Sequence, residues 1–325
     1  MAFAVRIHRT GGPEVLSYEA VELGRPGPGE AKIRQTAIGL NFIDTYFRSG
    51  LYPAPAGLPL VPGNEGAGVV LEVGEGVTDL APGDRVAYGS SLGAYATERL
   101  VPAGMLVKLP ETIEDQSAAA MMLKGMTARY LIRQTYVVKP GNTILVHAAA
   151  GGVGLILCQW AAHIGATVIG TVGSPEKAAL ARANGATHTI LYNDENFVER
   201  VREITKGALC NVVYDGVGQA TYPASLDCIK PRGLFVSFGN ASGPIQNFNL
   251  LALSQKGSLY VTRPTLFAYI ATRDELLANA SDLFDVVSAG VVKIPVNQTY
   301  ALADAQTAHR DLEARRTTGS TVLLP

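Results

Sequence analysis

The segment from Thr143 to Ala166, TILVHAAAGGVGLILCQWAAHIGA, decides the fold class of this chain. An apolar strand runs directly into Ala148-x-x-Gly151-x-x-Gly154, and an apolar helix follows. In a β-α-β unit this spacing permits a tight turn, and the free N–H groups at the helix start can then bind a pyrophosphate. A second strand near residue 170 completes the unit. The segment therefore predicts a dinucleotide site; the alternative is a glycine-rich loop that only joins packed elements.

After this segment, strands and helices continue to alternate, which predicts an α/β fold with a doubly wound parallel sheet. Ser174 and Pro175 are typical of an N-cap and a first helical position, and Gly185 is typical of a helix end. The expected strands cover residues 143–147, 167–172, 189–192, 212–214, 234–238, 258–262 and 320–324, and the expected helices cover residues 152–164, 175–184 and 275–289.

The N-terminal third has a different sequence pattern, in which short apolar runs are interrupted by turn motifs rich in Gly and Pro: RPGPGE, LVPGNEG, VGEGV and APGDRV. Short strands with Gly/Pro turns predict an irregular, β-rich, barrel-like domain. An Ala/Met/Leu-rich stretch at 115–133 predicts a helix that leads out of it. A chain of 325 residues is expected to form two domains. We place the first at residues 1–125, completed by a C-terminal return over 265–325, and the second at 126–264.

Charge and cysteine content limit the expected partners and compartment. The net charge is −1 and no run is rich in Lys or Arg, so nucleic acid and anionic membranes are not expected partners. Cys158, Cys210 and Cys228 stand far apart, which favours a reducing cytoplasm over a disulfide framework. Residues 141–175 lack charged side chains and are long enough to span a bilayer. Their internal glycines and β-branched ends nevertheless favour a buried strand–turn–helix–strand.

The end of the second strand distinguishes between the two nicotinamide dinucleotides. An NAD site usually places Asp or Glu there to hold the ribose hydroxyls, whereas residues 170–174 read GTVGS. Lys177 follows one helical turn later, and Tyr192 ends the third strand. A hydroxyl, a cation and a helix N-terminus suit the 2′-phosphate of NADPH, although a single Lys on a helix is commonly only solvated. The missing acid favours NADPH as the cofactor.

No metal site is evident from the histidines, which stand at positions 8, 147, 163, 188 and 309. None pairs with another histidine or a cysteine at metal-ligand spacing. Dehydrogenation of a simple alcohol commonly relies on a Lewis acid that activates the hydroxyl. A quinone accepts hydride readily and yields a weakly basic oxygen, so a hydrogen-bond donor suffices. The sequence therefore predicts a metal-free site that reduces electron-poor carbonyl compounds.

These motifs resemble the medium-chain dehydrogenase/reductase superfamily and, within it, the zinc-free, zeta-crystallin-like quinone oxidoreductases. The resemblance covers the whole chain. It rests on GGPEVL (11–16), GLNFIDTYFRSGLYP (39–53), PGNEGAG (62–68), APGDRVAY (81–88), HAAAGGVG (147–154), VVYDGVG (212–218), VSFGN (236–240) and GSLYVTRP (257–264). In zinc-containing relatives a Cys stands where this chain has Asn41 and a His where it has Asn64. The resemblance implies a GroES-like catalytic domain, a Rossmann domain that binds NADPH, and a homodimer joined through the strand around Tyr260.

The resemblance also implies the residues of the cofactor site. It assigns the pyrophosphate to Gly152 and Val153. It places Gly173, Ser174, Lys177 and Tyr192 around the 2′-phosphate, with Tyr130 nearby. The ribose and nicotinamide side would be lined by Gly216, Phe238, Gly239 and Asn240. The nicotinamide end would be enclosed by Phe42, Asp44, Thr45, Tyr46, Thr127, Arg263, Pro264 and Leu266.

Asn41, Asp44 and Tyr46 are the candidates for catalysis, because an amide, a carboxylate and a phenol can orient a carbonyl and donate to it as charge develops. The alternative is that Asn41 and Asp44 only cap the backbone of a turn. Arg263 faces the substrate or the 2′-phosphate, or forms only a surface ion pair. Two alternative functions stay open: an NADPH-dependent alkenal or enone double-bond reductase, and a cofactor-binding protein with little turnover.

Overall fold

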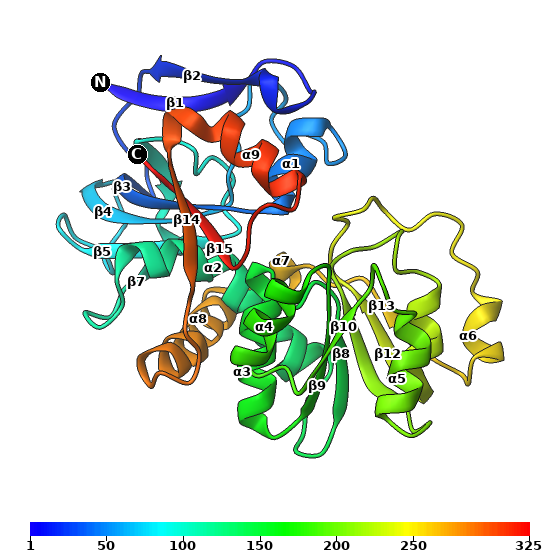
Figure 1. Ribbon diagram of the computed structural model, residues 1–325. Helices are drawn as coiled ribbons and strands as arrows, with labels where there is room; N and C mark the ends of the chain where they lie inside the picture. The colour runs from blue at the N-terminus through cyan, green and yellow to red at the C-terminus, as the bar shows by residue number, and fades with distance from the viewer. The chain divides into compact units, whose positions relative to one another are not determined.

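The computed structural model describes residues 1–325, which form two compact units (Figure 1). The first unit comprises Met1–Met126, Ile270–Ser288 and Ile294–Pro325, and the second comprises Thr127–Tyr269 and Ala289–Lys293. Met126 belongs to the first unit instead of the second. Two segments also differ from the expected division, because residues 265–269 and 289–293 belong to the second unit.

Contacts inside the second unit explain both differences. The ring of Tyr269 stacks on that of Tyr130 with centroids 4.3 Å apart, and its hydroxyl accepts a hydrogen bond from Thr135 Oγ1 at 3.0 Å. The side-chain amide of Gln159 donates to the carbonyl of Lys293 and accepts from its N–H, at 3.0 and 2.8 Å. These segments are therefore held by the second unit, although they follow or interrupt the return to the first.

The second unit is built on a six-stranded parallel sheet in the order β10-β9-β8-β11-β12-β13. This is the strand order of a Rossmann fold, in which the direction of winding reverses beside the first strand. The strands are β8 (Thr143–Val146), β9 (Thr167–Val172), β10 (His188–Leu191), β11 (Cys210–Asp215), β12 (Ile229–Ser237) and β13 (Tyr260–Thr262). The uncharged stretch at 141–175 is thus a buried strand–turn–helix–strand, as predicted.

Helices cover both faces of this sheet (Figure 1). Right-handed crossovers put α3 (Gly152–Ile164) and α4 (Pro175–Ala183) on one face and α5 (Phe197–Ile204) on the other. Val201 of α5 accordingly shares a core cluster with Leu145, Ile169 and Phe235 of the sheet. The smaller elements are the π-helical turn η3 (Leu131–Thr135), the 3-10 helix η4 (Ala224–Cys228), α6 (Leu251–Gln255) and α7 (Leu266–Tyr269).

All three cysteines lie in the second unit, and all are buried free thiols. Burial raises the pKa of Cys158 and of Cys210 to about 12. The pKa of Cys228 is raised for the same reason. These thiols pack as small apolar side chains.

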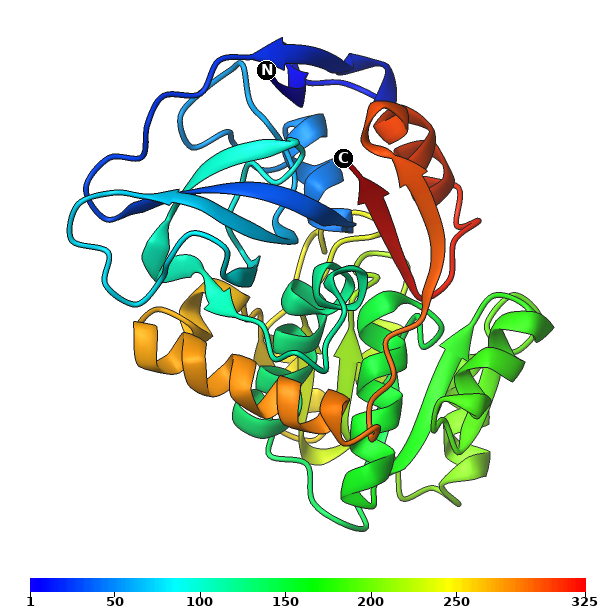
Figure 2. The same ribbon diagram turned by 90° about the vertical axis from the view of Figure 1, so that its left-hand side faces the viewer.

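The first unit contains a seven-stranded sheet in the order β14-β15-β3-β4-β5-β7, with β6 paired to β3, and a separate β1–β2 pair. The last strand pairs with β3 and with β14, and Figure 2 shows it in red beside the orange β14, so the chain end lies in the first unit as predicted. The strands are β1 (Ala2–Ile7), β2 (Leu16–Val21), β3 (Glu30–Leu40), β4 (Glu65–Val73), β5 (Arg85–Gly89), β6 (Glu98–Pro102), β7 (Val107–Lys108), β14 (Val296–Ala301) and β15 (Ser320–Leu324).

Four helices contribute to the first unit. They are α1 (Phe42–Ser49), most of α2 (Asp115–Tyr130), α8 (Arg273–Ser288) and α9 (Ala305–Glu313), with 3-10 helices η1 (Pro13–Val15), η2 (Ala103–Met105) and η5 (Leu302–Asp304). Its core is formed by side chains such as Ile33, Ile38 and Val86, which are fully buried. None of the helices in the chain is both long and apolar enough to cross a membrane.

Candidate functional site

The glycine-rich turn joins β8 to α3 in the second unit. Gly151 is the N-cap of α3 and provides no side chain for the first N–H groups of the helix, so those of Gly152 and Val153 have no partner within it. Gly154 allows a close approach, because a Cβ there would lie 2.4 Å from the carbonyl oxygen of Ala148. The turn can therefore bind an anion with backbone donors and the positive end of the helix dipole.

The four residues expected around a 2′-phosphate lie together at the ends of β9 and β10. Ser174 is the N-cap of α4, and its Oγ accepts the N–H of Lys177 at 3.3 Å. The hydroxyl of Tyr192 lies against Gly173, since a Cβ on Gly173 would be 2.6 Å from that oxygen. Tyr192 is exposed. The structure thus brings a hydroxyl, a helix N-terminus and a lysine to one corner of the sheet.

Two neighbours of this corner were not anticipated. Asn193 donates from its side-chain amide to the carbonyl of Gly173 at 2.8 Å and so ties the end of β9 to the loop after β10. Glu176 lies in the first turn of α4, where a hydrogen bond from Ser174 lowers the pKa of its carboxyl. The only indication in the sequence that Glu176 would lie in this corner was its position two residues after the N-cap.

The glycines after β11 and β12 pack against each other. A Cβ on Gly239 would lie 2.4 Å from the carbonyl oxygen of Gly216, and Gly216 lies against the ring of Phe238. Asp215 holds the first of these loops, because its carboxylate accepts two N–H groups of the loop at 2.7 and 3.0 Å. The structure therefore brings Gly216, Phe238 and Gly239 together, with the largely buried Asn240 next in the chain.

Tyr130, the last residue of α2, lies near Arg263. Burial raises the pKa of Tyr130, and the nearby positive charge of Arg263 opposes the increase. Arg263 follows β13, whereas Ser174 follows β9, and three strands of the sheet separate these two. The structure thus places Tyr130 near Arg263, and its place beside the 2′-phosphate stays a prediction.

The remaining predicted residues of the second unit lie near this edge or on α2. The carbonyl of Pro264 accepts a hydrogen bond from Arg263 Nη1 at 3.3 Å. The amide orientation of Asn240 that satisfies both groups has its oxygen accept from Arg263 Nη2 at 3.2 Å. Leu266 is buried, and Thr127 on α2 is half-buried.

In the first unit the candidate catalytic residues lie at the start of α1. The backbone N–H of the N-cap residue Asn41 donates to Asp44 Oδ2 at 2.9 Å. The side-chain amide of Asn64 donates to Asp44 Oδ1 at 2.8 Å, and the hydroxyl of Tyr95 donates to Oδ2 at 3.1 Å. Asp44 is fully buried. It thus has the capping role that the alternative interpretation gave it.

The environment of Asp44 brings the pKa of its carboxyl close to neutral pH. Burial raises the pKa of Asp44 to about 7, and the negative charge of Glu65 acts in the same direction. Hydrogen bonds from Asn64, Asn41 and Tyr95 favour the carboxylate and oppose the increase.

A buried ion pair lies on the other side of Asn41. Glu65, the first residue of β4, accepts from Asn41 Nδ2 at 2.8 Å and from the N–H of Leu123 at 2.7 Å, and it pairs with the ammonium group of Lys124. Sequence reasoning missed Glu65 and Lys124; a glutamate at the start of an apolar strand was the available signal. No group of three or more His, Cys, Asp or Glu side chains is placed to hold a metal ion.

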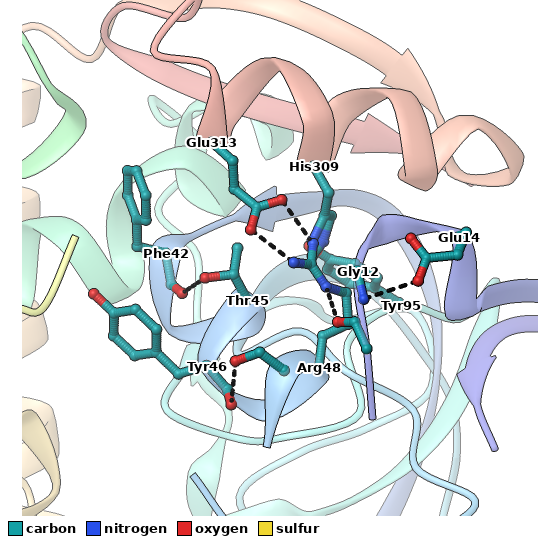
Figure 3. Close-up of polar contacts among 11 residues, drawn as sticks. Gly12, Glu14, Phe42, Thr45, Tyr46, Arg48, Tyr95, His309 and Glu313 are labelled. Atoms are coloured by element: carbon teal, nitrogen blue, oxygen red, sulfur yellow. Dashed lines mark hydrogen bonds and ion pairs between the residues drawn. The ribbon is translucent and has the colours of Figure 1, made fainter. Parts of the chain in front are cut away.

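The other predicted residues of α1 differ in their surroundings. Figure 3 shows the side chains of Phe42 and Tyr46 pointing away from Arg48, which is buried against α9. The hydroxyl of Thr45 donates to the carbonyl of Phe42 at 2.7 Å, inside the helix. The ring of Tyr46 packs edge-on against Tyr52, with centroids 5.3 Å apart.

Two families match this chain, each over residues that lie mostly in one of the two units. Residues 152–283 match the family described as zinc-binding dehydrogenase, and residues 27–111 match the alcohol dehydrogenase GroES-like domain. The chain is 57% identical to a quinone oxidoreductase of Pseudomonas aeruginosa over the whole of both proteins. It is 49% identical to a 2-haloacrylate reductase of Burkholderia sp., over 100% of this chain and 99% of that protein.

The fold is shared with solved structures of the same kind. The crystal structure of Escherichia coli quinone oxidoreductase complexed with NADPH matches with a TM-score of 0.98 at 50% identity, covering 99% of this chain and 100% of that one. Sequence and fold therefore agree over the full length of both units. The chain belongs to the quinone oxidoreductase family of the medium-chain dehydrogenase/reductase superfamily.

Proposed function

We propose that the protein transfers hydride from NADPH to quinones. The observation that carries this proposal is the corner of the second unit where Ser174, Lys177 and Tyr192 lie together. The strand that leads into this corner ends without the Asp or Glu that an NAD site usually provides. The relatives named quinone oxidoreductase support the choice of acceptor.

The residues present fit NADPH. Gly152 and Val153 would hold the pyrophosphate with their N–H groups, and the absence of a side chain at Gly154 leaves the turn tight. Lys177 and Tyr192 would hold the 2′-phosphate with charge-assisted hydrogen bonds, one from the ammonium group and one from the phenol. When bound, the cofactor supplies the hydride, and the protein supplies binding and orientation.

The first unit provides the groups proposed to act on the quinone. The phenol of Tyr46 can donate a hydrogen bond to an oxygen on which negative charge develops. Phe42 provides half-buried apolar surface on the same helix. Asn41 and Asp44 act indirectly, because their polar groups are engaged with Glu65 and with each other. We therefore assign them to positioning.

We further propose that turnover needs no metal ion. The amide groups of Asn41 and Asn64 donate to buried carboxylates, and an amide is a poor substitute for thiolate or imidazole as a zinc ligand. The purified protein is expected to contain no stoichiometric zinc and to keep its activity in EDTA. One zinc per chain by elemental analysis, lost together with activity, would overturn this.

A panel of acceptors tests the main proposal. NADPH oxidation is followed with 1,4-benzoquinone, phenanthrenequinone, an enal and 2-chloroacrylate, and the quinones are expected to give the highest kcat/KM. The second candidate is reduction of an activated double bond, which the similarity to a 2-haloacrylate reductase favours. Turnover of the enal or the haloacrylate without turnover of quinones would select it, and binding of NADPH without turnover would leave a cofactor-binding protein.

Assembly and location complete the proposal. β13 lies at the edge of the sheet and pairs only with β12, and Tyr260 and Val261 on it are exposed. An apolar edge strand favours pairing with a second copy, so we propose a homodimer joined along β13. Three free cysteines are consistent with a cytoplasmic location.

A further inference from the structure

A chain of buried hydrogen bonds connects Asp44 to the surface of the first unit through residues that no part of the proposed reaction uses. Arg48 on α1 pairs with Glu313 on α9, with Nη1 and Nη2 at 3.0 and 2.6 Å from the two carboxylate oxygens. Arg48 Nη1 also lies 2.9 Å from His309 Nδ1 (Figure 3). His309 Nε2 lies 3.0 Å from the hydroxyl of Tyr95, which donates to Asp44.

The chemistry of the side chains determines which atom donates and which accepts in each of these hydrogen bonds. A guanidinium group has only donors, so His309 Nδ1 must accept from Arg48 and the ring must carry its proton on Nε2. Nε2 then donates to the oxygen of Tyr95, and the Tyr95 hydroxyl is left to donate to Asp44. Burial and the charge of Arg48 lower the pKa of His309 to about 3, so the ring is neutral throughout the physiological range.

We infer that Arg48, His309 and Tyr95 form a one-way relay of donors that positions Asp44 as an acceptor, and with it the start of α1. The relay ends at Asp44 Oδ2, which also accepts the N–H of the N-cap residue Asn41. The helix that Asp44 holds carries Tyr46. The relay residues are thus positioning residues for the reaction, and their effect on turnover rests on the proposed function.

The packing around the relay supports a dedicated arrangement. The ring of Tyr95 leaves no room for a side chain at Gly63, where a Cβ would lie 2.3 Å from it, and Gly63 also has a φ of +92°. The rings of Tyr95 and His309 meet edge to face with centroids 5.7 Å apart. The backbone N–H of Tyr95 donates to Pro62 and its carbonyl accepts from Val5, at 2.9 and 2.8 Å.

The other charged groups near Asp44 are paired with one another. Glu65 is paired with Lys124, and Arg48 is paired with Glu313. Burial raises the pKa of Tyr95 well above its ordinary value, and that of Tyr88, further out, is also raised. A change in the titration of Asp44 therefore reports directly on the relay.

The test compares Tyr95→Phe with Tyr88→Phe in the full-length protein. Both remove a buried hydroxyl, but that of Tyr88 donates to Gln35 and lies outside the relay. In protein labelled with ¹³C at aspartate carboxyls, Tyr95→Phe is expected to raise the midpoint of Asp44 by about one to two pH units, the value of one hydrogen bond to a charged group. Tyr88→Phe is expected to leave it unchanged.

His309 provides the second arm. In wild-type protein the ¹⁵N spectrum of the ring is expected to show the Nε2–H tautomer without protonation from pH 5 to 9. His309→Gln, whose amide can still donate to Tyr95, is expected to keep the Asp44 midpoint, and His309→Leu to raise it. With 1,4-benzoquinone, kcat/KM is expected to fall about tenfold in Tyr95→Phe and His309→Leu, mainly through KM, with the pH profile moved upward.

The outcomes separate the two proposals. An Asp44 midpoint that does not move in Tyr95→Phe, or an Nδ1–H tautomer of His309, overturns the relay whatever the activity. Absence of quinone turnover in the wild-type protein overturns the proposed function, and the two NMR titrations then still decide the relay.

Discussion

Lys177 is the side chain on which the choice of cofactor depends most directly. Its backbone N–H is held by Ser174 at the start of α4, and this places it in the corner that also contains Tyr192. A charged donor in that corner distinguishes a 2′-phosphate from a 2′-hydroxyl, because only the phosphate brings a negative charge that the ammonium group attracts.

Lys177→Ala is therefore expected to weaken NADPH binding and to leave NADH binding nearly unchanged. A hydrogen bond to a charged group contributes about 1.5–3 kcal/mol, which corresponds to roughly 10- to 150-fold in Kd. Calorimetry with both cofactors measures this, and Lys139→Ala, an exposed lysine of the same unit, is the control. Equal weakening of both cofactors would show that Lys177 does not contact the phosphate.

Asp44 is expected to make the stability of the protein depend on pH. Its pKa is raised by burial to about 7 in the folded state, so the folded protein binds a proton that the unfolded chain releases above about pH 4. Between those values the contribution of Asp44 to the unfolding free energy falls by up to about 1.4 kcal/mol per pH unit, and above pH 7 it no longer changes. Urea titrations of wild-type protein and Asp44→Asn from pH 4 to 8 measure the difference, and parallel curves would contradict the assignment.

The turn from β8 into α3 places two opposing requirements on Gly154, one from helix propensity and one from packing. Gly154 lies in the first turn of α3, where alanine would be about 1 kcal/mol more favourable by helix propensity. A Cβ there would nevertheless lie 2.4 Å from a backbone oxygen, and such overpacking costs about 1–3 kcal/mol. The steric cost exceeds the gain in propensity.

Gly154→Ala is thus expected to lower the unfolding free energy by up to about 2 kcal/mol and to weaken NADPH binding, because the displaced turn no longer presents its N–H groups. Chemical denaturation and calorimetry measure the two effects. Gly104→Ala, where a Cβ would meet no atom within 4 Å, serves as the control. A stabilised Gly154→Ala protein would mean that the turn has room for the methyl group.

The elements that the sequence predicted best are those with strong apolar patterns and clear ends. The bounds of α3, β9 and β15 agree with the prediction, because each is a buried run that begins or ends at a turn residue. Helices α1, α5 and α9 were missed. In α1 the polar residues Asp44 and Arg48 face the interior, which reverses the usual pattern of an amphipathic helix.

One part of the candidate site could be predicted from the sequence and another could not. The backbone site at the start of α3 was predictable because its glycines adjoin a strand and a helix. The surroundings of Asp44 were not, because His309 lies 261 positions from Arg48 in the sequence and a single sequence holds no signal for such a contact. The stacking of Tyr130 on Tyr269 could not be predicted for a similar reason: α2 precedes the sheet, and only the packing of its last turn decides which side chains it meets.

The edge strand β13 determines the assembly that we expect. Tyr260 is 63% exposed on a strand that has one neighbour in the sheet. Tyr260→Lys places a charge on this apolar edge and is expected to convert the dimer to a monomer at micromolar concentration. Light scattering measures the mass, with Val137→Lys, an exposed apolar residue off the strand, as the control. A monomeric wild-type protein would reject the dimer.

The depth of the three thiols has a consequence for a protein that handles electrophiles. Quinones form covalent adducts with thiolates, and an accessible cysteine would be consumed by the compound that the protein is meant to reduce. With the pKa of Cys158 and Cys210 raised to about 12, only about one thiol in 100,000 is ionised at pH 7, and burial shields the sulfur atoms further. The cysteines of the folded chain are therefore protected from reaction with quinones. Partial unfolding would expose the thiols and remove this protection.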